Sequence, residues 1–178
     1  MPLPFSFRGP TMGRVTLEAV GAERAETLSN LFQLYVHDFT DFWTERRVEL
    51  QEDGRFPPYP PLATYWSDPT RSAFLIRAAG ELAGFVLLER ESHSGLPTDF
   101  NMGEFFVARH YRREGVGREA ALLAIQARAG QWELAVARRN TGALVFWRRI
   151  AAAVASEVEE LDRHDPRWNG AILRFRVN

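Results

Sequence analysis

The sequence contains no cysteine and no lysine. Without cysteine it forms no disulfide, thiolate zinc site or iron–sulfur cluster, and it has no cysteine nucleophile. Without lysine, Schiff-base chemistry on a lysine and a Walker A phosphate loop are excluded. All 22 basic residues are therefore arginine, against 23 acidic residues. The net charge of −1 argues against a domain built mainly to coat nucleic acid or an anionic membrane.

Long apolar runs are also missing. The longest, such as residues 150–155, are far shorter than the ~20 residues that span a bilayer. The first residues lack the charged and apolar regions of a signal peptide, so we expect a cytoplasmic protein. A chain of 178 residues has room for one domain with one core. We expect residues 1–12 to form a tail and residues 13–178 to form a single domain.

Hydrophobic periodicity predicts a mixed α/β domain whose sheet begins with antiparallel strands. Residues 40–70, rich in aromatic residues and proline, are expected to form one or two short helices around a stiff loop. The expected strands are 14–19, 72–78, 82–89, 100–107, 132–137 and 171–177, and the expected helices are 23–39, 115–129 and 140–154.

The loop after the strand 100–107 has the features of an anion site. No Ser, Thr, Asp or Asn stands at the start of the next helix to cap its free amides. Two glycines and several arginines stand there instead. Uncapped helix amides flanked by guanidinium groups suit a phosphate or pyrophosphate, and glycine lets the backbone approach it. The alternative is an ordinary glycine-containing turn with solvated arginines.

Two motifs resemble the GNAT N-acetyltransferase superfamily. The first, similar to its acyl-CoA signature, is Arg112-x-x-Gly115-x-Gly117. The second, similar to a helix motif of the family, is Asn140-x-x-Ala143-x-x-Phe146-Trp147. The resemblance covers about residues 14–178 and is nearest to an uncharacterised group of bacterial predicted acetyltransferases. It implies the GNAT fold, a mostly antiparallel sheet of about seven strands with helices on both faces.

The resemblance also implies a cofactor, acetyl-CoA or CoA, held between the fourth and fifth strands, and no metal. A dinucleotide-binding interpretation of the same glycines fails, because the third glycine would fall at Ala120. The cofactor-binding residues carried over from the family are Phe106, Val107, Arg112, Arg113, Glu114, Gly115, Val116, Gly117, Arg118, Asn140, Phe146 and Trp147.

Transfer of acetyl to an amine requires a base, because a protonated amine has no lone pair. Glu104 is the first candidate, since it lies on the strand expected to contact the cofactor, beside aromatic residues that raise a carboxyl pKa. Strand alternation places Glu104 and Phe106 on one face, and Phe105 and Val107 on the other. The alternative is that Glu104 pairs with an arginine. Weaker candidates are His110, Asp99 and His37.

The acceptor pocket is expected from the first helix and the aromatic segment after it. Its predicted residues are Tyr35, Asp38, Phe42 and Tyr65; Trp43 and Trp66 are also candidates, but for these two core packing is the favoured interpretation. Asp38 is a candidate anchor for an ammonium group. The arginine pairs at 46–47, 138–139 and 148–149, and the acidic run 157–160, are expected to form ion pairs and solvated faces.

The function that the resemblance implies is acetyl transfer from acetyl-CoA to a primary amine of an unidentified small-molecule or peptide acceptor. Neither nucleic acid nor a membrane is expected as a partner, and a homodimer through exposed terminal strands is possible. The alternative is a non-catalytic acyl-CoA-binding module. Trp147 supports it, because the family often has a tyrosine there that protonates the leaving thiolate.

Overall fold

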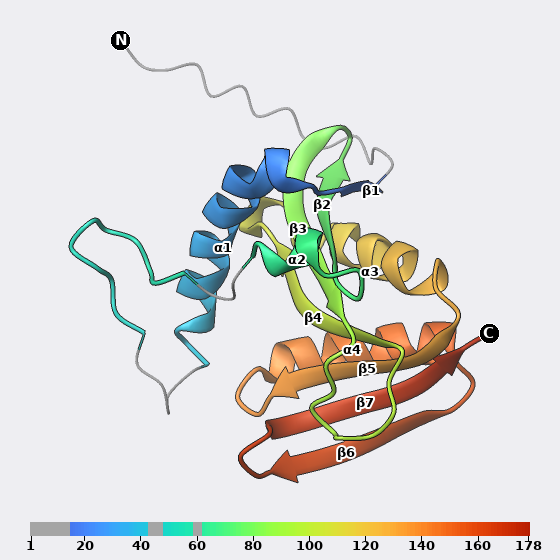
Figure 1. Ribbon diagram of the computed structural model, residues 1–178. Coiled ribbons are helices and arrows are strands. Elements are labelled where there is room, and N and C mark those ends of the chain that lie inside the picture. Colours follow the sequence, from blue (N-terminus) through green and yellow to red (C-terminus); the bar gives the residue numbers. More distant parts are fainter. Residues whose placement is uncertain (1–14, 43–47, 59–61) are drawn as a thin grey trace.

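The computed structural model describes residues 15–42, 48–58 and 62–178 (Figure 1). The expected tail, residues 1–12, together with Trp43 and the arginine pair 46–47, lies outside the described residues. In chain order the elements are β1 (Val15–Ala19), η1 (Ala22–Arg24), α1 (Ala25–Phe39), α2 (Thr64–Ser67), β2 (Ser72–Ala78), β3 (Glu81–Glu89), β4 (Phe100–Val107), η2 (Arg109–Tyr111), α3 (Val116–Gln126), β5 (Gly130–Ala137), α4 (Thr141–Val154), β6 (Val158–His164) and β7 (Asn169–Val177).

The strands form one seven-stranded sheet in the order β1-β2-β3-β4-β5-β7-β6. Neighbouring strands are antiparallel except β4 and β5, which are parallel. This confirms the expected mixed, mostly antiparallel sheet of about seven strands. Among the described residues, every helix is too short or too polar to span a bilayer.

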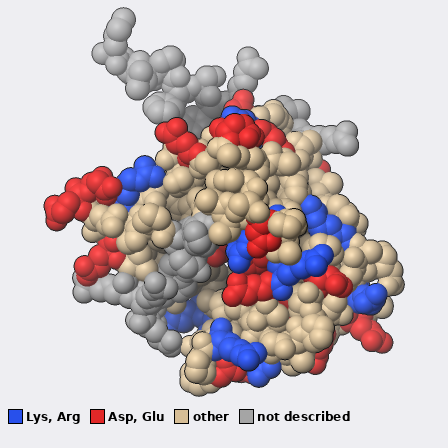
Figure 2. Space-filling view, viewed as in Figure 1, with Lys and Arg blue, Asp and Glu red and all other residues tan. Residues whose placement is uncertain are grey.

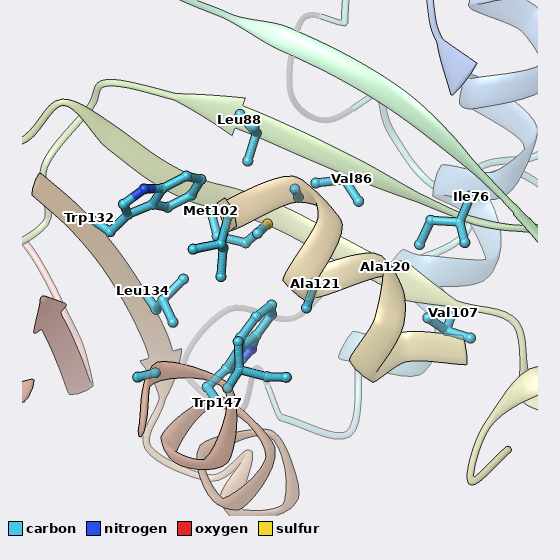
Figure 3. Close-up of a cluster of buried hydrophobic side chains, with 14 of the residues drawn as sticks. Ile76, Val86, Leu88, Met102, Val107, Ala120, Ala121, Trp132, Leu134 and Trp147 are labelled. Atoms are coloured by element: carbon cyan, nitrogen blue, oxygen red, sulfur yellow. The ribbon is translucent and has the colours of Figure 1, made fainter. Parts of the chain in front are cut away.

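Each face of the sheet is covered by two helices, as the periodicities require (Figure 1). One core joins α3 and α4 to the sheet, and Figure 3 shows Met102, Leu134 and Trp147 within it. The other core joins α1 and α2 to the opposite face, around Phe85 and Phe106. The alternation predicted for β4 is correct, because Phe106 belongs to the α1 core and Val107 to the α3 core.

Strand β6 was not predicted from the sequence. It pairs only with β7, at the edge of the sheet, and most of its side chains are exposed. An edge strand of this kind needs no apolar alternation, so its charged residues carried no strand signal. The expected ion pairs do form here: Arg138 lies 2.7 Å from Asp162, and Arg148 lies 2.5 Å from Glu160. Acidic and basic residues are intermingled on the face shown in Figure 2.

The centre of the sheet is split. Strands β4 and β5 pair only at Phe100 with Trp132 and at Asn101 with Glu133. The pairing of β4 with β3 shifts register beside Gly103, which marks a β-bulge at the point where β4 leaves β5. The remaining halves of β4 and β5 therefore diverge and leave a gap between them.

A buried ion pair fixes the closed end of this gap. Glu133, fully buried on β5, lies 2.7 Å from Arg174 on β7. Glu133 also accepts hydrogen bonds from Ser92 and from the backbone and hydroxyl of Ser94, in the β3–β4 loop. Burial raises the pKa of Glu133, but the hydrogen bonds from Ser94 and Ser92 outweigh it and leave the pKa below its usual value. The pair thus ties two strands and a loop together.

We expect Arg174→Met to lower the free energy of unfolding by about 3–5 kcal/mol, because it leaves the Glu133 carboxylate buried without its counter-charge. Urea unfolding at pH 7 measures the loss. Arg176→Met is the matched control, since Arg176 is exposed on the same strand, and its effect should be small. Equal stability of the two variants would contradict the role given to this ion pair.

Candidate active site

A large cavity of about 1120 Å³ lies where β4 has separated from β5. Its walls come from the end of α1, the second half of β4, the start of α3 and the first turns of α4. The aromatic residues of this lining are Tyr35, Phe39, Phe42, Phe105, Phe106, Phe146 and Trp147. The arginines are Arg112, Arg113, Arg118 and Arg149. The cavity therefore offers apolar walls with cationic groups along one end.

The N-terminus of α3 opens onto this cavity without a side-chain cap. Gly115, its N-cap residue, has φ 84°, a left-handed conformation that favours glycine. Gly117 needs no such conformation, and a Cβ added to it would meet only ordinary contacts, the nearest at 3.5 Å from Val107. Neither the backbone conformation nor the packing therefore requires a glycine at position 117. Its lack of a side chain leaves the first-turn N–H groups of α3 open to a ligand.

The arginines around the large cavity differ in their partners. Asp38 accepts hydrogen bonds from Arg112 and, at 2.9 Å, from Arg109. Burial raises the pKa of Asp38, but these hydrogen bonds outweigh it and leave the pKa below its usual value. By contrast, Arg113, Arg118 and Arg149 form no ion pair with any described residue. The cavity therefore carries excess positive charge, which suits a polyanion.

A smaller cavity of about 410 Å³ adjoins the large one. The linings of both include Tyr35, Phe105, Asn140 and Trp147. The two cavities therefore meet at the gap between β4 and β5. The titratable residues that line the smaller cavity are Tyr35, Tyr65, Arg71, Glu89, Glu91, His93 and Glu104.

Glu104 of β4 lies in the lining of the smaller cavity, next to this junction. Its carboxylate accepts a hydrogen bond from the Tyr35 hydroxyl, and it forms no ion pair with a described arginine. Loss of water contact raises the pKa of Glu104 to about 8; the Tyr35 hydrogen bond opposes this shift and the nearby charge of Glu89 adds to it. Glu104 is thus a carboxyl group able to take up a proton near neutral pH.

Comparison with known proteins gives the family of this chain. The sequence profile described as "Acetyltransferase (GNAT) family" matches residues 28–151. The chain belongs to this family. The matched residues include most of α1, the sheet strands that border the gap, α3 and most of α4, so they contain the main walls of both cavities. No curated protein sequence matches the chain.

Several solved GNAT-type structures resemble this one. An acetyltransferase from Thermus thermophilus has a TM-score of 0.63 at 16% identity, over 94% of this chain and 99% of that chain. Aminoglycoside acetyltransferase AAC(6')-Ib, in complex with coenzyme A and kanamycin, has a TM-score of 0.62 at 10% identity. The match covers 92% of this chain and 95% of that chain. PaiA N-acetyltransferase from Thermoplasma acidophilum, in complex with coenzyme A, has a TM-score of 0.54 at 12% identity. The match covers 92% of this chain and 99% of that chain. At these identities the likeness shows the GNAT fold.

Most of the residues that the GNAT resemblance assigns to the cofactor line the large cavity. Val116 and Glu114 do not: the Val116 side chain is in the core and Glu114 is exposed on the loop. Asn140 lines the cavity and also caps α4, because its side-chain oxygen accepts from the Ala143 amide at 3.1 Å. The residues brought together are Phe106, Val107, Arg112, Arg113, Gly115, Gly117, Arg118, Asn140, Phe146 and Trp147.

The expected acceptor residues divide between the two cavities. Tyr35 lines both and Tyr65 lines the smaller one, whereas Asp38 and Phe42 line only the large one. Asp38 is already engaged by two arginines, so an ammonium group is not its evident partner. Trp66 borders a separate groove beside α1.

The weaker base candidates, His37, Asp99 and His110, are absent from the described lining of both cavities.

Sequence reasoning missed the charged wall of the smaller cavity. Glu89 ends β3, and Arg71, which precedes β2, lies 2.8 Å from it. Glu91 and His93 come from the β3–β4 loop. Their shared location depends on the register of β2, β3 and β4, which no local pattern reveals.

Ionisation of Glu104 should lower the free energy of unfolding as pH rises. Its raised pKa means that the folded state favours the neutral acid, so wild type loses stability between its unfolded pKa and about pH 8. Glu104→Gln, which still accepts from Tyr35, should therefore match wild type near pH 4.5 and exceed it by about 2–4 kcal/mol at pH 9. Denaturant unfolding at both pH values measures this difference. A constant difference across this range would contradict the raised pKa.

Proposed function

We propose that the protein transfers an acetyl group from acetyl-CoA to a primary amine of a still unidentified acceptor. The observation that carries the proposal is the position of Glu104, a carboxyl group with a raised pKa at the junction of a cationic cavity and a smaller charged cavity. In this arrangement one substrate occupies each cavity, and the reacting atoms meet in the gap between β4 and β5.

The large cavity fits coenzyme A in shape and charge. The uncapped start of α3 would hold the pyrophosphate, together with Arg113 and Arg118, which form no ion pair within the described part of the chain. The splayed half of β4, at Phe106 and Val107, would lie along the pantetheine arm, with the Val107 carbonyl already accepting from Arg112, and Phe146 offers an apolar wall. When bound, acetyl-CoA supplies an acyl group activated as a thioester.

The residues at the gap would supply the proton transfer. An alkyl ammonium has a pKa of about 10, so the acceptor must lose a proton before its nitrogen can attack. Glu104 takes this proton, directly or through a water, while the C–N bond forms and the C–S bond breaks. Tyr35 holds the carboxylate in place. The leaving thiolate, with a thiol pKa of about 8.5, does not require an acid, so Trp147 is compatible with turnover.

The second candidate is a GNAT-fold protein that binds acyl-CoA without turnover. Its support is Trp147, whose indole cannot give up a proton and which lines both cavities. The acidic groups beside the gap favour the enzyme, because a module that only binds the cofactor has no use for a base there. The two are separated by acetyl transfer to an amine under conditions where CoA binding is saturated.

Gly117→Trp should abolish binding of CoA and acetyl-CoA while the protein still folds, because the indole would cover the amides at the start of α3. Calorimetric titration measures the affinity, with NAD as the negative ligand. Leu123→Trp is the matched control, since Leu123 is 41% exposed farther along the same helix. Unchanged CoA affinity in Gly117→Trp would remove the cofactor assignment.

Glu104→Gln should lower the rate of acetyl transfer by about 100-fold or more and leave CoA affinity unchanged. In wild type, kcat/KM for one fixed amine should rise with pH around a midpoint near 8, the pKa of Glu104. Tyr35→Phe removes a hydrogen bond that lowers this pKa, so it should move the midpoint to higher pH. Steady-state assays of thiol release from pH 6 to 9 measure both effects. A wild-type rate in Glu104→Gln over this range would exclude Glu104 as the base.

A further inference from the structure

The smaller cavity has an excess of negative charge. The single arginine in its described lining, Arg71, lies 2.8 Å from Glu89, 3.4 Å from Glu91 and 3.7 Å from Asp68, which is not part of that lining. One positive charge is therefore surrounded by three carboxylates before Glu104 is counted. Arg71 is therefore not available to bind a carboxylate group of an acceptor.

The fold places one of these carboxylates close to Glu104. A Cβ added at Gly103 would lie 3.0 Å from the carboxyl carbon of Glu89, so the glycine at the β4 bulge leaves room for this side chain. The Glu89 side chain is only 11% exposed, and its negative charge acts on Glu104. Glu89 and Glu104 line the same cavity and interact electrostatically, which favours a cation near them.

The remaining walls of the cavity also suit an organic cation. Tyr65, Phe39 and Trp168 contribute aromatic surface. The faces of such rings attract an organic cation.

We propose that the acceptor is a small dication, a primary amine that carries a second ammonium or guanidinium group. The reacting nitrogen lies at Glu104, and the second cation lies against Glu89 and Glu91. The inference rests on the proposed function for the identity of the reacting end. The binding of the second cation rests only on the carboxylates and aromatic walls of the smaller cavity.

Three matched sets of amines test the proposal. The dications are diaminopropane, diaminobutane and diaminopentane; each is compared with the alkyl monoamine and the ω-amino acid of the same chain length. Calorimetry on the CoA-saturated protein measures binding, and thiol release from acetyl-CoA measures transfer. We expect at least one diamine to bind about tenfold more tightly than its monoamine, the equivalent of about 1.4 kcal/mol, and the amino acid to bind most weakly.

The variant Glu91→Gln tests whether the Glu91 carboxylate binds the second cation. Glu91 is 69% exposed on the loop, so its replacement should leave folding intact, lower diamine affinity several-fold and leave monoamine affinity unchanged. Glu81→Gln is the control, since Glu81 is exposed at the opposite end of β3. Equal affinity for diamines and monoamines, or an equal loss in both variants, overturns the inference. Tight diamine binding without acetylation supports the cation site and overturns the proposed function. Acetylation of all three classes of amine with equal affinity supports the proposed function and overturns the cation site.

Discussion

The early end of the pairing between β4 and β5 is the constraint on which the rest of the structure depends. Two residue pairs join these strands, and the Glu133–Arg174 ion pair holds that junction together with the β3–β4 loop. Beyond Asn101 the bulge at Gly103 turns β4 away from its neighbour. A sheet that continued to pair would have filled this space with backbone hydrogen bonds. The cavities and the position of Glu104 all follow from the interrupted pairing.

The gap also separates charge. On one side the start of α3 and three arginines without ion-pair partners in the described chain present positive potential. On the other side Glu89 and Glu91 present negative potential, and Arg71 compensates only part of it. Fields of opposite sign at the two mouths would steer an anionic and a cationic substrate to different entrances. Two substrates of opposite charge could then reach one junction without competing for the same site.

The sequence was most informative where structure is local. The alternation in β4 placed Glu104 and Phe106 opposite Phe105 and Val107 because the period of a strand is fixed by its backbone. The glycines and arginines around α3 indicated an anion site for a similar reason, since a helix start and its loop are contiguous. The sequence pattern did not predict strand β6, because a charged edge strand lacks apolar alternation. Contacts such as Asp38 with Arg112, separated by 74 positions, depend on tertiary packing that no local pattern encodes.

The split sheet has a consequence for association of the protein with itself. Divergence of β4 from β5 creates two strand edges in the middle of the fold, and an open edge is a template for an added strand from another molecule. Arg112 covers part of the β4 edge, because its Nε donates to the Val107 carbonyl at 2.7 Å while its terminal nitrogen is held by Asp38. A guanidinium group at that position occupies a backbone acceptor and adds a charge, which are two of the ways in which proteins protect sheet edges from aggregation.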